Sequence, residues 1–180
     1  AVGALLRARG TLGDLLVPVP QDRRSGQPLP VGNGISLLFF RVPAAVASAP
    51  LAELARLALD QIRDMARRRV PVWMSTLLDF CRWLPAWLYM LIVAIPTRGR
   101  LASFGFSDTG DSLSRLTELA GAPIADAWHM PANVHPPGLT FVFSSFRGSL
   151  QIAIGWTEGV VSQDEVDALV DHLHASLLPP

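Results

Sequence analysis

Two hydroxyl side chains, Ser107 and Thr109, flank Asp108 at the end of an apolar run. Residues two apart on an extended strand lie on the same face, so the spacing predicts that both hydroxyls point to one side. Hydroxyl groups aimed at a reacting carbonyl can stabilise a developing oxyanion or orient an acceptor. The same residues also suit a capped strand end, in which Asp108, Thr109 and Asp111 bond nearby backbone amides before a turn. The sequence leaves both interpretations open.

The histidines and the cysteine do not form a further catalytic or metal centre. His172 and His174 lie two apart on a predicted helix, where they point to different faces and do not share a metal. His129 and His135 lie in a proline-rich loop with no third ligand nearby. Cys81 has apolar neighbours, which are typical of a packed thiol rather than a nucleophile. We therefore predict no catalytic residue and no metal site in this chain.

Composition limits the class of protein. The chain has 180 residues, 50% of them hydrophobic and 17% charged, and a formal net charge of zero at pH 7. This length suits one domain with its own core, and this hydrophobicity argues against disorder. A neutral balance argues against a nucleic-acid partner. The single cysteine cannot form an internal disulfide, which leaves the redox compartment open but gives no support to a secreted disulfide scaffold. A cytoplasmic location is the default expectation.

The hydrophobic pattern alternates strands and helices, which predicts one α/β domain over residues 1–180, with a single mixed β-sheet packed by helices. Strands are expected where apolar runs end at Gly or Pro and where apolar residues alternate around a Gly turn, at residues 15–19, 35–42, 101–110, 139–146 and 149–156. Helices are expected where apolar residues recur at steps of three or four, at residues 1–9, 51–69 and 162–178. Ser162 and Glu165 form a capping box at the start of the last helix.

Residues 77–96 are the most apolar stretch. A membrane-spanning helix needs about 20 consecutive apolar residues, and two charged residues and a proline interrupt this stretch, so we do not expect it to span a bilayer. One interpretation is a buried pair of helices broken at Pro85. The other is a surface that touches membrane or lipid substrate. Its aromatic candidates for lipid contact are Trp83, Trp87 and Tyr89.

In order and spacing, these segments resemble the C-terminal domain of bacterial wax ester synthase/diacylglycerol acyltransferases. That family belongs, with condensation domains, to the chloramphenicol acetyltransferase-like superfamily. The likeness covers nearly the whole chain. The segments that carry it are Gly32-Asn33 and residues 35–42, 51–69, 77–96, 107–110, 146–150 and 162–178. The resemblance implies the C-terminal half of the chloramphenicol acetyltransferase-like fold.

The resemblance also implies a function. In the superfamily, a His of the motif His-His-x-x-x-Asp-Gly acts as general base on an alcohol or amine, which then attacks an acyl thioester. That motif does not occur here. The resemblance therefore implies that an N-terminal half, in the same or a second chain, supplies the catalytic His, and that this chain is not active alone. Ser107, Asp108 and Thr109 would face the substrate tunnel between the halves.

As such a C-terminal half, the chain would take part in moving a long-chain acyl group to an alcohol or diacylglycerol. Acyl-CoA would be a co-substrate, and no bound cofactor is expected. The enzyme would lie in the cytoplasm or at the periphery of the inner membrane or of lipid bodies. The alternative is a non-catalytic module of the same fold that binds lipid or a carrier protein, or serves as a scaffold for a partner chain.

A charged cluster follows the first predicted strand. Within the resemblance, Asp22, Arg23 and Arg24 would form an interdomain ion pair that fixes the crossover loop. They also suit a solvated loop, in which they would contribute little to stability. Asn33 lies between two glycines, a setting typical of a left-handed turn rather than of a substrate contact.

Overall fold

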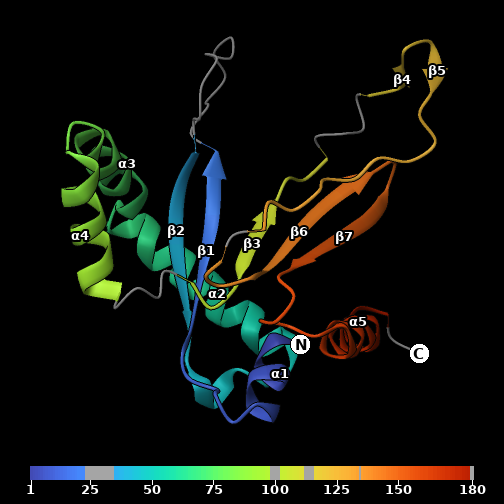
Figure 1. Ribbon diagram of the computed structural model, residues 1–180, viewed down its shortest axis with the longest axis horizontal. Coiled ribbons are helices and arrows are strands. Elements are labelled where there is room, and N and C mark those ends of the chain that lie inside the picture. The colour runs from blue at the N-terminus through green and yellow to red at the C-terminus, as the bar shows by residue number, and fades with distance from the viewer. Residues whose placement is uncertain (23–34, 98–101, 112–115, 134, 179–180) are drawn as a thin grey trace.

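The computed structural model describes residues 1–22, 35–97, 102–111, 116–133 and 135–178 (Figure 1). Its mixed α/β class is the one that the sequence predicts. The helices are α1 (Val2–Ala8), α2 (Leu51–Arg67), α3 (Val70–Cys81), α4 (Ala86–Thr97) and α5 (Gln163–Leu177), with a short 3-10 helix at Ala44–Val46. The strands are β1 (Leu15–Asp22), β2 (Ile35–Val42), β3 (Gly105–Asp108), β4 (Glu118–Leu119), β5 (Ala122–Pro123), β6 (Leu139–Phe146) and β7 (Ser149–Trp156).

The strands pair in groups rather than in the single sheet that we expected. β1 and β2 form an antiparallel pair in which Leu15 lies opposite Val42. β3 is parallel to β6, and β6 is antiparallel to β7, which makes a mixed three-stranded sheet. The two groups meet where the Ser103 amide donates to the Leu16 carbonyl at 2.7 Å and the Leu16 amide donates to Ser103 Oγ at 2.9 Å. Ser103 Oγ therefore accepts the hydrogen bond that the carbonyl of a neighbouring strand would usually accept.

The helices α2 and α5 cover one face of these strands (Figure 1). Leu139 and Phe141 of β6 pack against Val166 and Leu169 of α5, and all four are almost completely buried. Leu139 and Phe141 are two residues apart on β6, so both side chains point to the same, covered face of the strand. The apolar face of β6 is therefore the face that meets α5.

The outer edge of β2 is capped by a side chain of α2. The Arg41 amide donates to Gln61 Oε1 at 3.0 Å, and Gln61 Nε2 donates to the Arg41 carbonyl at 2.8 Å. The Arg41 guanidinium also pairs with Asp14. Hydrogen bonds from the Ala44 amide and, to a lesser extent, from Arg41 lower the pKa of the Asp14 carboxylate below its ordinary value. These contacts bond backbone groups at the edge of β2 that would otherwise be free to pair with a strand of another chain.

An ion pair joins α1 to the start of α5. The Arg9 guanidinium donates to the two Glu165 carboxylate oxygens at 2.6 and 2.5 Å. The Ser162 amide donates to the same carboxylate at 2.8 Å, and Ser162 Oγ accepts from the Glu165 amide at 3.3 Å, so the predicted capping box is confirmed. The hydrogen bonds from Arg9 and then from Ser162 lower the pKa of Glu165 from 4.5 to about 2.

The segment between β3 and β6 contains elements that the sequence did not predict. β4 and β5 form a short hairpin that stands away from the core (Figure 1). The chain then returns across β7, where Gln151 bonds to Asp126 and Pro131 lies on Gly155. A Cβ at Gly155 would come within 2.9 Å of Pro131 Cγ, so only glycine lets this segment lie so close to the strand.

The apolar stretch 77–96 is broken before Pro85, as predicted, since α3 ends at Cys81 and α4 begins at Ala86. The interpretation as a buried pair of helices does not fit the aromatic side chains of this stretch, whereas the alternative, an exposed surface, does. Trp83 is 83% exposed and Trp87 69% exposed, while Tyr89 is 37% exposed. Among the described helices, none combines the length and the hydropathy that crossing a bilayer would need.

The lowered pKa of Glu165 predicts a pH-dependent stability. A carboxylate with a depressed pKa stabilises the folded state fully above its ordinary pKa of 4.5. This stabilisation is lost as pH falls through about 2, where the folded protein binds the proton. The difference in unfolding free energy between the wild type and Glu165→Gln should therefore be largest near neutral pH and shrink below pH 4.5. Urea denaturation over a pH series measures it, with the exposed Glu158→Gln as control. A difference that stays constant or grows down to pH 2 would contradict the ion pair.

Candidate functional site

The three residues predicted to form a site lie at the end of β3. Ser107 is within the strand, opposite Val142 of β6, and is partly buried. Asp108 is the last residue of the strand and is exposed. Thr109 follows it. The structure brings the three residues to the sheet edge where β3 leaves β6, but it gives them different surroundings.

Thr109 is held by the neighbouring strand. Its amide donates to the Phe143 carbonyl at 2.9 Å, and its Oγ1 donates to the same carbonyl at 3.2 Å. The Ser145 amide donates to the Gly110 carbonyl at 2.9 Å, so the bonding between the strands continues beyond the end of β3. A Thr hydroxyl has one proton to donate. Thr109 would have to give up its bond to Phe143 before it could donate to an oxyanion.

Asp108 serves the turn that follows. Its Oδ1 accepts from the Gly110 amide at 2.9 Å, which is the local bond expected of an Asp before a turn. Gly110 has a φ of 55°, a left-handed conformation that glycine adopts without strain. The strand-end interpretation therefore accounts for the contacts of Asp108 and Thr109. Ser107 is left as the stronger candidate for contact with a reacting group.

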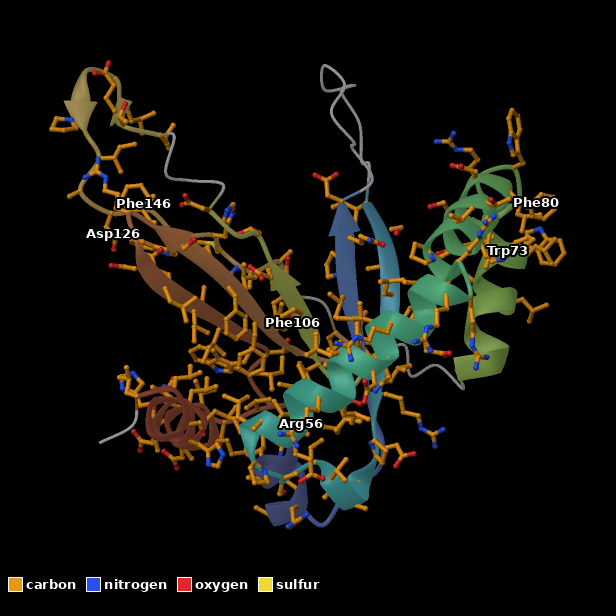
Figure 2. All side chains as sticks on the ribbon, turned by 180° about the vertical axis from the view of Figure 1, so that it is seen from behind. Arg56, Trp73, Phe80, Phe106, Asp126 and Phe146 are labelled. Carbon is orange, nitrogen blue, oxygen red and sulfur yellow. The ribbon has the colours of Figure 1, made fainter. Side chains whose placement is uncertain are left out.

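Ser107 faces the side of the sheet that α2 and α5 do not cover. Its neighbour Phe106 lies between β3 and α2, and alternation along the strand turns Ser107 the other way (Figure 2). The strand registers place four polar side chains of β6 and β7 on the same face as Ser107, of which Ser149 lies at the exposed end of the hairpin. We call the other three, together with Ser107, the polar face: Ser107, Thr140, Ser144 and Gln151.

The polar face contains groups that are unusual in a protein interior. Ser144 is only 3% exposed. Gln151 Oε1 is buried and has no hydrogen-bond partner among the residues that the structure describes. Buried polar atoms are nearly always bonded, and an exception asks for an explanation such as an absent partner. On the polar face, Gln151 Oε1 could therefore accept a hydrogen bond that the described part of the chain does not supply.

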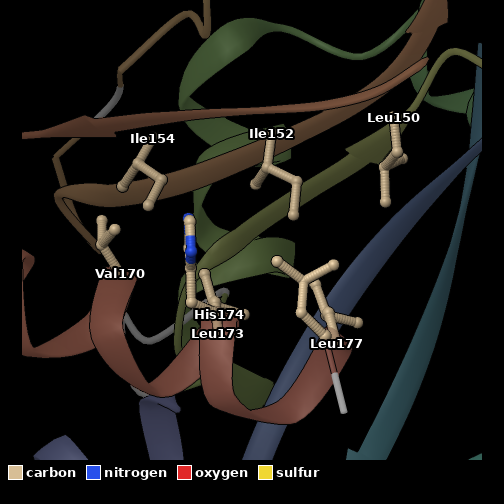
Figure 3. A pocket seen from close by; sticks show the side chains of 8 residues that line it. Leu150, Ile152, Ile154, Val170, Leu173, His174 and Leu177 are labelled. Carbon is tan, nitrogen blue, oxygen red and sulfur yellow. The ribbon is translucent and has the colours of Figure 1, made fainter. Parts of the chain in front are cut away.

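An apolar groove of about 370 Å³ lies on the opposite side of the sheet, between β7 and α5 (Figure 3). Ile152 and Ile154 line it from the strand, and Val170, Leu173 and Leu177 line it from the helix. A second apolar groove, of about 340 Å³, lies between α2 and β1 to β3. Neither groove includes Ser107, because both are on the helix-covered face.

The histidines of α5 lie on different sides of that helix, as predicted. The His174 side chain lines the groove with β7, whereas His172 lies toward α1. Within the described residues, no group of three potential metal ligands is found. Arg23, Arg24 and Asn33 lie outside the described residues, and only Asp22 of that cluster is placed, at the exposed end of β1. The interdomain ion pair stays a prediction.

The arrangement of these strands and helices is similar to part of the condensation-domain fold, which is chloramphenicol acetyltransferase-like. The chain is similar to the starter condensation domain of the rhizomide synthetase RzmA, with a TM-score of 0.56 and 15% identity over 94% of this chain. It is also similar to a double mutant of that domain, with a TM-score of 0.52 and 16% identity over 94% of this chain. In both comparisons the chain spans 37% of the other chain's length.

No protein-family model matches the sequence, and no curated protein matches it either. At 15% and 16% identity, the solved structures show the fold alone. The chloramphenicol acetyltransferase-like fold implied by the resemblance in sequence is therefore confirmed. The wax ester synthase family within it stays a prediction.

The contacts of Asp108 predict a structural role that mutation can measure. Asp108→Ala removes the acceptor for the Gly110 amide and should lower the unfolding free energy by about 1 kcal/mol. Asp108→Asn keeps an oxygen in that position and should retain most of the stability. Urea denaturation of both variants, with the exposed Asp171→Ala as control, tests this. Equal losses for Asn and Ala at position 108 would show that the bond to Gly110 is not the cause.

Proposed function

We propose that the chain is the C-terminal lobe of a two-lobed O-acyltransferase. The enzyme would move a long-chain acyl group from acyl-CoA to an alcohol or diacylglycerol. The observation that carries the proposal is that 94% of this chain aligns with only 37% of a condensation domain. A lobe that corresponds to part of a larger fold needs the remaining part to complete it.

The missing motif supports the same conclusion. A general base must lie within hydrogen-bond reach of the nucleophile that it activates. The sequence contains no His-His-x-x-x-Asp-Gly segment. In the proposed enzyme, an N-terminal half in the same or a second chain supplies that His. The acyl donor and the acceptor rest on the resemblance in sequence, and the likeness to condensation domains supports only an acyltransferase-like fold.

The exposed surface near the polar face suits contact with a second lobe. Leu119 at the tip of the β4–β5 hairpin is 69% exposed, and Trp128 and Met130 on the returning segment are 61% and 86% exposed. Apolar side chains grouped on a surface commonly mark an interaction site. A lobe that covers them would also approach Gln151, whose contact with Asp126 lies on the same returning segment.

Ser107 is the residue that we propose to act on the substrate. Its place on the polar face would let its hydroxyl donate to the oxyanion or orient the acceptor across the boundary between the lobes. Asp108 and Thr109 would position it by fixing the end of β3 against β6. The alternative is a non-catalytic module of the same fold, with which the absence of a His-His-x-x-x-Asp-Gly motif is also consistent.

Reconstitution tests the proposal. The chain alone should not transfer an acyl group from acyl-CoA to a long-chain alcohol in detergent, and it should do so when joined to its N-terminal half. In the joined enzyme, Ser107→Ala should lower kcat by about a hundredfold, the effect of losing one donor to an oxyanion, with a smaller change in KM. Ser149→Ala, at the exposed start of β7, is the matched control and should leave kcat unchanged.

Three results would count against this account. Turnover by the isolated chain would contradict a site completed by another half. A joined protein that binds acyl chains without transferring them would favour the non-catalytic module. Equal rates for Ser107→Ala and Ser149→Ala would remove Ser107 from the chemistry.

A further inference from the structure

Helices α3 and α4 carry an apolar surface that the described chain does not cover. Residues 70–97 contain only two charged side chains, those of Asp79 and Arg82. One side of α3 lies against β2. The other side presents Trp73, Leu77 and Phe80, which are 69%, 50% and 63% exposed. Figure 2 shows Trp73 and Phe80 on the outer side of α3, turned away from the strands.

The exposed apolar residues of α3 follow a helical period. Trp73, Leu77 and Phe80 are spaced by four and three residues, which places them on one face of α3. Trp83 lies in the turn between the two helices, where its amide donates to the Phe80 carbonyl at 3.1 Å. On α4, Trp87 and Met90 are three residues apart and are 69% and 59% exposed. We call this set the aromatic patch: Trp73, Leu77, Phe80, Trp83, Trp87 and Met90.

An exposed arginine lies at each end of α3, next to a tryptophan of the patch. Arg69 precedes the helix, and its carbonyl accepts from the Trp73 amide at 3.1 Å. Arg82 follows the helix and precedes Trp83. Tryptophan rings and arginine side chains both suit the boundary between water and acyl chains, where the charged group can reach anionic headgroups. Asp79 is the one acidic residue of these helices, so with the two arginines the balance is positive. The patch therefore combines apolar area with a charge complementary to an anionic lipid surface.

The lengths of the helices fix how they would meet a membrane. Each has 12 residues. At 1.5 Å per residue, such a helix is about 18 Å long, much shorter than the hydrocarbon core of about 30 Å. Helices this short lie in the interface rather than across the bilayer.

We propose that α3 and α4 bind the surface of an anionic lipid bilayer, with the aromatic patch inserted among the acyl chains and Arg69 and Arg82 at the headgroups. The patch lies at the opposite extremity of the molecule from the β4–β5 hairpin (Figure 1). A second lobe that covers that hairpin therefore need not reach the patch. This inference does not depend on the acyl-transfer activity.

Vesicle flotation tests the proposal directly. The purified chain should float with vesicles of phosphatidylcholine containing phosphatidylglycerol, and less with vesicles of phosphatidylcholine alone. Trp83→Ser combined with Trp87→Ser should weaken partitioning by about tenfold or more, because two exposed rings no longer enter the interface. Trp128→Ser removes an exposed tryptophan outside the patch and should not change it. Arg69→Gln with Arg82→Gln should remove the preference for anionic vesicles.

Several outcomes would overturn the proposal. One is a wild-type chain that does not float with either vesicle. Another is an equal loss for the patch variant and Trp128→Ser. If light scattering shows that the patch variant dissociates a dimer, or a complex with the N-terminal half, the patch is a protein interface instead. The acyl-transfer assay in detergent contains no vesicles, so the two proposals fail separately.

Discussion

The parallel pairing of β3 with β6 is the contact on which the rest of the structure depends. It joins residues more than thirty positions apart, with Phe106 opposite Phe141. Gly105 permits the close approach, since a Cβ there would lie 2.7 Å from Thr140 Oγ1. On the covered face, the rings of Phe104 and Phe141 meet edge to face at 5.7 Å between centroids. Such aromatic pairs add stability beyond the area that they bury.

This pairing sets the two faces of the sheet. It directs Phe106 toward α2 and therefore Ser107 away from the helices. β6 then offers Leu139 and Phe141 to α5 on one face and Ser144 on the other. The core and the polar face are thus consequences of one register. A shift by one residue would exchange them, because side chains alternate along a strand.

Local signals in the sequence predicted the elements that depend on them. Both strands of the β6–β7 hairpin have the predicted bounds, because alternation and the Arg147-Gly148 turn specify them locally. Those two residues have φ values of 50° and 82°, as a tight hairpin turn requires. The start of α5 was likewise given by Ser162 and Glu165.

Features that depend on distant parts of the chain were not predictable. β4 and β5 have two residues each, too few for a periodic pattern to appear. The bond from Thr109 to Phe143 links residues 34 apart, so the sequence could not choose between a free and a bonded hydroxyl. Apolar composition also could not choose between burial and exposure of Trp83 and Trp87, because burial depends on what another element covers.

The account holds that this chain is one lobe of a site that a second lobe completes across the polar face. Hydrogen exchange of the chain, with and without its separately produced N-terminal half, measures this most directly. We expect slower exchange in residues 105–111 and in the segment 124–133 on addition of that half. Unchanged exchange in both segments at saturating concentration of the N-terminal half would contradict the account.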